Sequence, residues 1–186
     1  MWTPARAVFV VALLAYGWVH FEWAHEAGHV VGALATGGRV QQVVLHPAAF
    51  SRTDVTPNPA PLVEVWSGPA LGCVFGVIAG AWTLALPRVG AIAWRGVGGL
   101  VLLANGVYIG VGPVAPAGDT EVMRQLGTPG WVMVAFGVAA CAGGVWMWRG
   151  ARARLPDAPI GWAHALVPLA AATALGTVGA IAFPGP

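Results

Sequence analysis

The sequence predicts an all-α polytopic membrane protein of about five transmembrane helices, with a short β-type segment between the first helix and the second. Three observations predict this class. The 186 residues are 58% hydrophobic and only 9% charged, whereas soluble domains carry roughly 25% charged residues. The apolar residues gather in five long runs separated by proline- and glycine-rich stretches. Ten tryptophans are available for the aromatic belts found at membrane interfaces.

The ends of the five spans are set by breaks in the hydrophobic runs. The first run stops at Gly37-Gly38, a typical helix stop. It lacks the small-residue cleavage site of a signal peptide, so we expect a retained span. Gly68-Pro69 in the second run either breaks the helix to admit water or is tolerated as a kink. We expect a single transmembrane domain, 1–186, with spans at about residues 7–35, 62–86, 97–111, 131–148 and 162–183.

The segment between the first two spans, residues 39–61, has a different composition. Its first part, RVQQVVLH, alternates and is β-branched, and the following PAAFSRTDVTPNPAP is rich in proline and turn residues. This pattern predicts a short strand or hairpin, followed by an extended, proline-restricted connection.

The charged residues are few and scattered along the sequence. All nine basic residues are arginines and the net charge is +2. They lie between spans and form no basic run, which argues against nucleic acid as a partner. Six fall on the side of the N-terminus and three on the other, so the positive-inside rule places the N-terminus in the cytoplasm. Cys73 and Cys141 lie in separate spans without the spacing of a metal site, and we expect them to be packing residues.

The first span contains the motif His25-Glu26-Ala27-Gly28-His29, which fits H-E-x-x-H. On a helix, residues four apart share a face, so His25 and His29 can bind one metal ion together. Glu26 lies beside them, where it can take a proton from a metal-bound water without binding the metal itself. This arrangement is typical of zinc-dependent hydrolysis. Ionisable residues at membrane depth usually mark function.

Two histidines and a water leave a tetrahedral zinc ion one protein ligand short. The histidines lie at the end of the first span that is far from Arg6. The third span ends on that same side and leads into the segment carrying Asp119, so the topology favours Asp119 as the third ligand. Asp157 and His164 lie on the opposite side, and Asp54, Glu64 and His46 belong to the loop or entry of the second span. Glu121, in the same segment as Asp119, is a further candidate.

Two further polar residues share the first span. Glu22 lies one turn before Glu26 and is either a partner that orients a histidine ligand or an acid at an aqueous cavity. His20 points away from the metal-binding face, so we expect a packing or interfacial role.

Four features together resemble the site-2 protease family of intramembrane zinc metalloproteases, particularly its small bacterial members without extra domains. These are HEAGH in an early span, the segment RVQQVVLHP, Gly68-Pro69, and NGVYIGVGPVAPAGD, which runs from Asn105 to Asp119. The resemblance covers residues 18–127. At the last of these features the chain reads Gly118-Asp119-Thr120 where the family usually reads Leu-Asp-Gly.

The resemblance implies a protease that hydrolyses a peptide bond in or near the membrane span of a protein substrate. It implies that His25, His29 and Asp119 bind one Zn²⁺ ion, that Glu26 is the general base, and that Asn105 polarises the scissile carbonyl. Residues 40–45 would then either offer a free strand edge to the substrate or form a hairpin that covers the site.

The implied partners are the lipid bilayer and a membrane-protein substrate, and the implied location is a bacterial inner membrane. The alternative is a non-catalytic integral membrane subunit that retains the motif for structure. A further form of it is a membrane protein that binds a metal, a haem or a pigment through His20, His25, His29 and His164.

Overall fold

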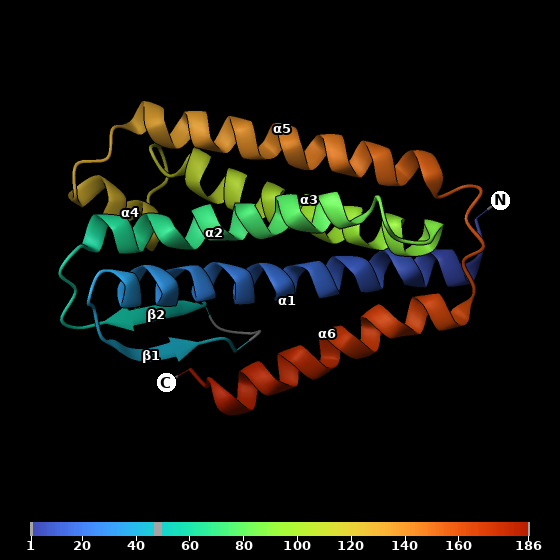
Figure 1. Ribbon diagram of the computed structural model, residues 1–186, viewed down its shortest axis with the longest axis horizontal. Coiled ribbons are helices and arrows are strands. Elements are labelled where there is room, and N and C mark those ends of the chain that lie inside the picture. Colours follow the sequence, from blue (N-terminus) through green and yellow to red (C-terminus); the bar gives the residue numbers. More distant parts are fainter. Residues whose placement is uncertain (1, 47–49, 186) are drawn as a thin grey trace.

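Five long helices lie roughly side by side along the long axis of the molecule, with a small hairpin and a short helix at one end (Figure 1). The computed structural model describes residues 2–46 and 50–185. In this part of the chain, five helices are long and apolar enough to cross a membrane. The elements are α1 (Pro4–Ala35), β1 (Val40–Val44), β2 (Arg52–Val55), α2 (Pro61–Trp82), α3 (Arg88–Val111), α4 (Asp119–Gln125), α5 (Gly130–Arg154) and α6 (Trp162–Ala182).

The predicted fold class is therefore confirmed, and the protein is an integral membrane protein with its two ends at opposite ends of the bundle (Figure 1). The helix boundaries differ from the predicted ones at the end of the bundle that carries Arg88 and Arg154. The third span starts at Arg88 rather than near residue 97, and the fourth continues to Arg154 rather than ending near residue 148. Hydropathy falls in these segments while helical hydrogen bonding continues. The second span ends at Trp82 rather than at residue 86, because Pro87 follows.

Local sequence explains how α1 begins and ends. The Thr3 side chain accepts a hydrogen bond from the backbone N–H of Arg6 (3.3 Å), and Pro4 occupies the first helical position. At the other end, Gly37 adopts a positive φ of 80°, a conformation that glycine takes at little cost. The 32 residues of α1 span about 48 Å, which exceeds the ~30 Å hydrocarbon core.

Glycines allow the helices to approach closely. A Cβ atom on Gly106 would lie 2.9 Å from the carbonyl oxygen of Gly137, and one on Gly137 would lie 2.5 Å from the Cα of Gly110. Gly99 and Gly144 face each other in the same way further along α3 and α5. Small residues that permit such backbone contact are typical of helix pairs in membranes.

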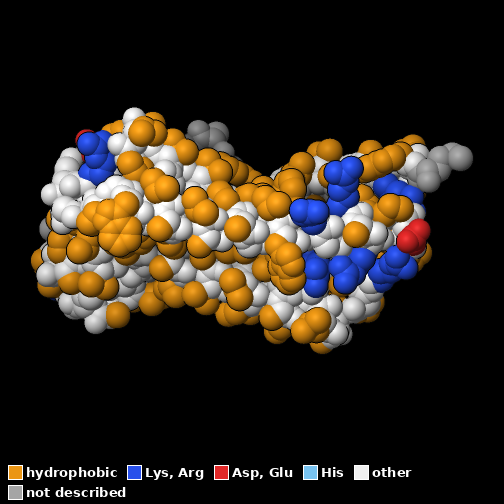
Figure 2. All heavy atoms as spheres, turned by 90° about the horizontal axis from the view of Figure 1, so that it is seen from above, with side chains coloured by type: hydrophobic (Ala, Val, Ile, Leu, Met, Phe, Trp, Pro, Cys, Tyr) orange, Lys and Arg blue, Asp and Glu red, His pale blue; other side chains and the backbone are white. Residues whose placement is uncertain are grey.

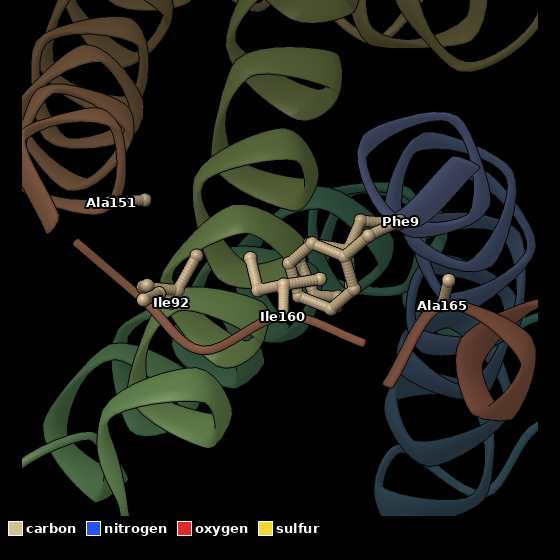
Figure 3. Close-up of a cluster of buried hydrophobic side chains, with 8 residues drawn as sticks. Phe9, Ile92, Ala151, Ile160 and Ala165 are labelled. Carbon is tan, nitrogen blue, oxygen red and sulfur yellow. The ribbon is translucent and has the colours of Figure 1, made fainter. Parts of the chain in front are cut away.

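A cluster of hydrophobic side chains packs the end of the bundle that carries the N-terminus (Figure 3). Phe9 of α1, Ile92 of α3 and Ile160 of the α5–α6 connection lie at its centre and are at most 9% exposed. Arg6 extends from α1 to the same connection, where Nη2 donates to the carbonyl oxygens of Pro156 (2.7 Å) and Ala158 (3.0 Å). These contacts fix α6 beside α1.

The opposite end of the bundle carries the hairpin and α4. The strands β1 and β2 pair antiparallel, with Val43 opposite Thr53 and Val44 opposite Arg52. The hairpin is thus one of the two predicted forms of this segment, but β2 lies in the part expected to be an extended connection. Pro47, the last residue of the predicted segment RVQQVVLHP, lies outside the described residues. The sequence did not predict α4, which begins at Asp119.

Candidate metal centre

The side chains of His25, His29 and Asp119 converge at the end of the bundle where α1, α3 and α4 meet. The Oδ2 atom of Asp119 lies 2.8 Å from Nε2 of His25 and 3.3 Å from Nε2 of His29. One ligand atom from each of the three residues lies within 4.8 Å of the other two. The loop after α3 therefore returns Asp119 to the motif across some ninety positions of sequence, as the topology argument predicted.

Each histidine uses its other ring nitrogen to bind a neighbouring helix. Nδ1 of His25 lies 2.8 Å from Oδ1 of Asn105 on α3. The Asn105 amide also donates through Nδ2 to the carbonyl oxygen of Val101 (2.9 Å), so Oδ1 is the acceptor and Nδ1 of His25 carries a proton. Nδ1 of His29 lies 2.8 Å from the carboxylate oxygen Oε1 of Glu64 and 3.1 Å from the carbonyl oxygen of the same residue.

These contacts fix the chemistry of the ring nitrogens that face Asp119. Because both Nδ1 atoms donate to acceptors, the Nε2 lone pairs are directed at a carboxylate oxygen. Such an arrangement requires positive charge between the three groups, supplied either by protons on Nε2 or by a metal ion. Two imidazolium rings with centroids 4.9 Å apart, each in a residue only 3% exposed, would repel each other and lose their hydration.

A single divalent ion fits this set of donors. Ligand atoms bound at about 2.0–2.1 Å to a tetrahedral zinc ion lie about 3.3 Å apart. The two separations that involve Asp119 are 2.8 and 3.3 Å, and all three ligand atoms lie within 4.8 Å of one another. Two imidazoles and one carboxylate form a ligand set of the kind that catalytic zinc uses. Histidine ligands whose second nitrogen binds a carboxylate or an amide oxygen are also the rule at such sites.

Glu26 is buried beside the histidines and is 2% exposed. Its Oε2 atom accepts a hydrogen bond from Oγ1 of Thr53 on β2 (2.8 Å). Glu26 also lines the cavity that reaches the site. The hairpin thus holds this carboxylate in place, and Glu26 is not one of the three converging ligands.

Tyr108 and Gly118 position the candidate ligand Asp119. The Tyr108 hydroxyl accepts from the backbone N–H of Asp119 (2.9 Å) and donates to the carbonyl oxygen of Ala117 (3.2 Å). Gly118 has φ of 51°, and a Cβ atom there would lie 2.6 Å from the same hydroxyl. Burial alone would raise the pKa of the Asp119 carboxyl, but when the Nε2 atoms of His25 and His29 carry protons, their hydrogen bonds and charge outweigh burial and hold that pKa well below its usual range. The carboxylate is therefore ionised and able to bind a cation.

Close contact between α1 and α2 closes one side of the site. A Cβ atom on Gly28 would lie 2.8 Å from the Cα of Gly68, and one on Gly68 would overlap the ring of His29. Pro69 is accommodated within a continuous α2 helix. Gly68-Pro69 therefore does not interrupt the helix, and Gly68 gives the His29 ring room to approach.

A cavity of about 430 Å³ reaches the site from the space between α1 and α3. His25, Glu26 and Asp119 contribute to its lining, which is otherwise mainly apolar. Trp18 and Val107 also line it and are 50% and 55% exposed, so it opens to the outer surface of the bundle. The remaining lining residues are Phe21, Phe50, Ser51, Leu100, Leu103, Ala104 and Tyr108.

The structure brings together all five residues that the sequence singled out, but it leaves other polar residues of the motif region apart. Among the described residues, the ring nitrogens of the two histidines hydrogen-bond to Asn105, Glu64 and Asp119, so Glu22 is not the partner that orients either histidine. His20 packs against the rings of Tyr16, Phe75 and Trp94, as expected of a packing residue. His164 contacts the backbone N–H of Gly161. Neither His20 nor His164 belongs to the converging group.

Three contributors escaped the sequence analysis: Glu64 as a partner of His29, Thr53 as a partner of Glu26, and Tyr108 as a partner of Asp119. The sequence indicates Glu64 only as a possible metal ligand. A signal for it existed, because a glutamate in the first turn of an apolar helix needs a partner when it is buried.

Comparison of the chain with models of known protein families, with curated proteins and with solved structures finds no match.

Proposed function

We propose that this protein is a membrane-embedded zinc metalloprotease that hydrolyses a peptide bond in or near the membrane span of a protein substrate. The observation that carries the proposal is the convergence of two Nε2 lone pairs on the carboxylate of Asp119, with Glu26 buried beside them. Ligation alone needs no additional acid next to the histidines, whereas hydrolysis needs a base.

Each residue then has a distinct role. His25, His29 and Asp119 would hold the ion, which when bound supplies Lewis-acid activation of water and of the scissile carbonyl. Glu26 accepts the proton of the attacking water and passes it to the departing amine, and Thr53 keeps its carboxylate oriented. Asn105 is fully buried and both ends of its amide are engaged, so we assign it the positioning of His25 rather than contact with substrate.

The cavity between α1 and α3 supports an apolar substrate that enters from the bilayer. Its walls carry Leu100, Leu103 and Val107, which would be poorly matched to a charged peptide. A helical segment hides its carbonyls in internal hydrogen bonds, so the substrate must unwind before attack. The hairpin strand nearer to the site is β2, because Thr53 contacts Glu26. We therefore expect any added substrate strand to follow β2 rather than residues 40–45, which include β1.

The test compares the Glu26→Gln variant with the wild type. Both proteins are purified and reconstituted in liposomes with a panel of single-span membrane proteins. Wild type should bind about one zinc ion per chain and cleave at least one substrate. Glu26→Gln should keep the zinc and lose cleavage by a factor on the order of 10² to 10⁴, the usual contribution of a general base. Unchanged cleavage by the variant, or purified wild type that binds iron or a coloured cofactor in place of zinc, would contradict the proposal.

A further inference from the structure

The end of the bundle opposite the candidate metal centre carries most of the positive charge. The arginines look scattered in sequence, but Figure 2 shows arginine side chains gathered at one end of the α5 face, bordered by hydrophobic side chains. Six of the nine arginines lie in the parts of α1, α3 and α5 that are at that end: Arg6, Arg88, Arg95, Arg149, Arg152 and Arg154. Among the described residues, the ion pair formed there joins Arg88 to Asp157 (3.2 Å).

Two of these arginines line one groove. A hollow of about 560 Å³ between α3 and α5 is lined by Arg95 of α3 and by Arg149 of α5. The rest of its lining is Cys141, Ala142, Val145, Trp146 and Gly150. The groove thus has two guanidinium groups toward the helix ends and an apolar wall that runs toward the middle of α5.

Arg95 is held in position by its surroundings. Its Nε donates to Oγ1 of Thr83 (3.2 Å), and its Cζ lies 5.4 Å from the ring centroid of Trp146. Its Nη1 atom packs against Gly150, where a Cβ atom would overlap it. Within the described residues, neither Arg95 nor Arg149 forms an ion pair with a carboxylate.

The two arginines lie near the ends of their helices, where a membrane-spanning helix reaches the headgroup level. Arg95 lies seven residues inside the start of α3 and Arg149 five residues before the end of α5, which places them about 10 and 8 Å from the helix ends. Trp82 and Trp146, which are 63% and 64% exposed, mark the interfacial zone at this end, because tryptophan prefers the headgroup level.

We propose that the Arg95–Arg149 groove is a binding site for one anionic phospholipid. The two guanidinium groups bind the phosphate, for which their planar forks are suited, and one acyl chain lies along Ala142 and Val145. An ammonium-bearing headgroup is disfavoured because Arg152 and Arg154 add further positive charge at the same end. This site is independent of the proposed protease activity.

The experiment counts bound lipids by native mass spectrometry of the purified full chain in a neutral detergent. The probes are phosphatidylglycerol, phosphatidylcholine and inorganic phosphate. We expect one tightly bound phosphatidylglycerol for the wild type. We take a factor of about five for each arginine that contacts the phosphate itself, so Arg95→Gln/Arg149→Gln should bind this lipid on the order of 30-fold more weakly. Val145→Trp, which fills the groove without changing charge, should also weaken binding.

The matched control is Arg152→Gln, which removes one charge from the same helix three residues beyond Arg149, outside the groove lining. Its affinity should stay within about twofold of wild type. An equal loss in Arg152→Gln and Arg149→Gln, or equal affinity for phosphatidylcholine, would overturn the site in favour of general surface charge. Displacement of the lipid by millimolar inorganic phosphate would overturn the lipid assignment in favour of a soluble phosphate compound.

Discussion

The carboxylate of Glu64 lies 2.8 Å from Nδ1 of His29, on the side of the ring away from Asp119. An acid in the first turn of α2 thereby fixes the proton of a histidine on α1 and directs the other ring nitrogen at the candidate ion. Asn105 does the same for His25 from α3. Three helices are therefore joined through the ligands, and the ring orientations depend on groups that do not touch the ion.

The residues that hydrogen-bond the Nδ1 atoms of the two histidines should affect the affinity of the site for a metal ion. Glu64→Ala removes the acceptor for His29, so zinc should bind 10- to 100-fold more weakly, the usual effect of losing such a partner. Glu64→Gln retains an acceptor oxygen and should lose less. Zinc affinity is measured by competition with a chromogenic chelator. Glu121→Ala is the control, because this exposed acid of α4 binds Gln125 and, among the described residues, no hydrogen bond joins it to a histidine. Equal affinity in Glu64→Ala and wild type would contradict the assignment.

Asp119 should be required for stable metal binding. Asp119→Ala removes the only carboxylate in the converging group of the described residues, and we expect the purified variant to contain little zinc. Chelation should also lower the melting temperature of the wild type. An ion present at 1,000 times its Kd contributes about 4 kcal/mol to the folded state. The melting temperature of Asp119→Ala should not respond to chelator. A wild type that melts at the same temperature with and without chelator would count against a bound ion.

The fold class follows from the sequence because each membrane helix satisfies its own backbone hydrogen bonds, so a long apolar run is a sufficient signal. The convergence of the three candidate ligands could also be predicted, since H-E-x-x-H is local and the span order brings Asp119 to the same end. The helix boundaries near the arginines could not be predicted from hydropathy, because Arg88 and Arg95 lower the hydropathy of a segment that stays helical.

The contacts around the ligands could not be predicted for a different reason. The Thr53 hydroxyl contacts Glu26 only because β2 pairs with β1 in one register and packs against α1. Tyr108 contacts Asp119 because the loop after α3 turns back at Gly118. Such relationships depend on three-dimensional packing between segments, and no periodicity in a single sequence encodes them.

The glycine at position 68 should be intolerant of a side chain. In Gly68→Ala, the added methyl group would overlap the His29 ring, so α1 and α2 must separate or the ring must rotate. Overpacking of this kind costs about 1–3 kcal/mol, and zinc affinity should fall with it. Gly90→Ala is the control, because its Cβ would lie at ordinary contact distance, 3.6 Å from Leu86. Thermal unfolding and zinc content report both effects, and a Gly68→Ala protein that matches Gly90→Ala in both would refute the packing argument.

The orientation of the chain in the membrane, predicted from its arginines, can be tested by labelling. The positive-inside rule predicts that the end carrying Arg88 and Arg154 faces the cytoplasm, so the N-terminus lies inside and the site lies nearer the outer leaflet. A cysteine at Thr128, between α4 and α5, should react with an impermeant maleimide in intact cells, and one at Asp157 should react only after lysis. These variants should be made in a chain lacking Cys73 and Cys141. The reverse labelling pattern would invert the topology.

The route between α1 and α3 should be required for cleavage but not for metal binding. Ala104→Trp places an indole in the half-buried wall of the 430 Å³ cavity, so we expect cleavage of a membrane substrate to fall at least tenfold while zinc content stays near that of wild type. Val138→Trp adds the same group to a residue of α5 that is 64% exposed and should leave cleavage unchanged. If Ala104→Trp cleaves normally while Glu26→Gln does not, the substrate reaches the site by another path and the hydrolytic role of Glu26 is unaffected. If neither substitution reduces cleavage in a preparation that binds zinc, the activity resides elsewhere.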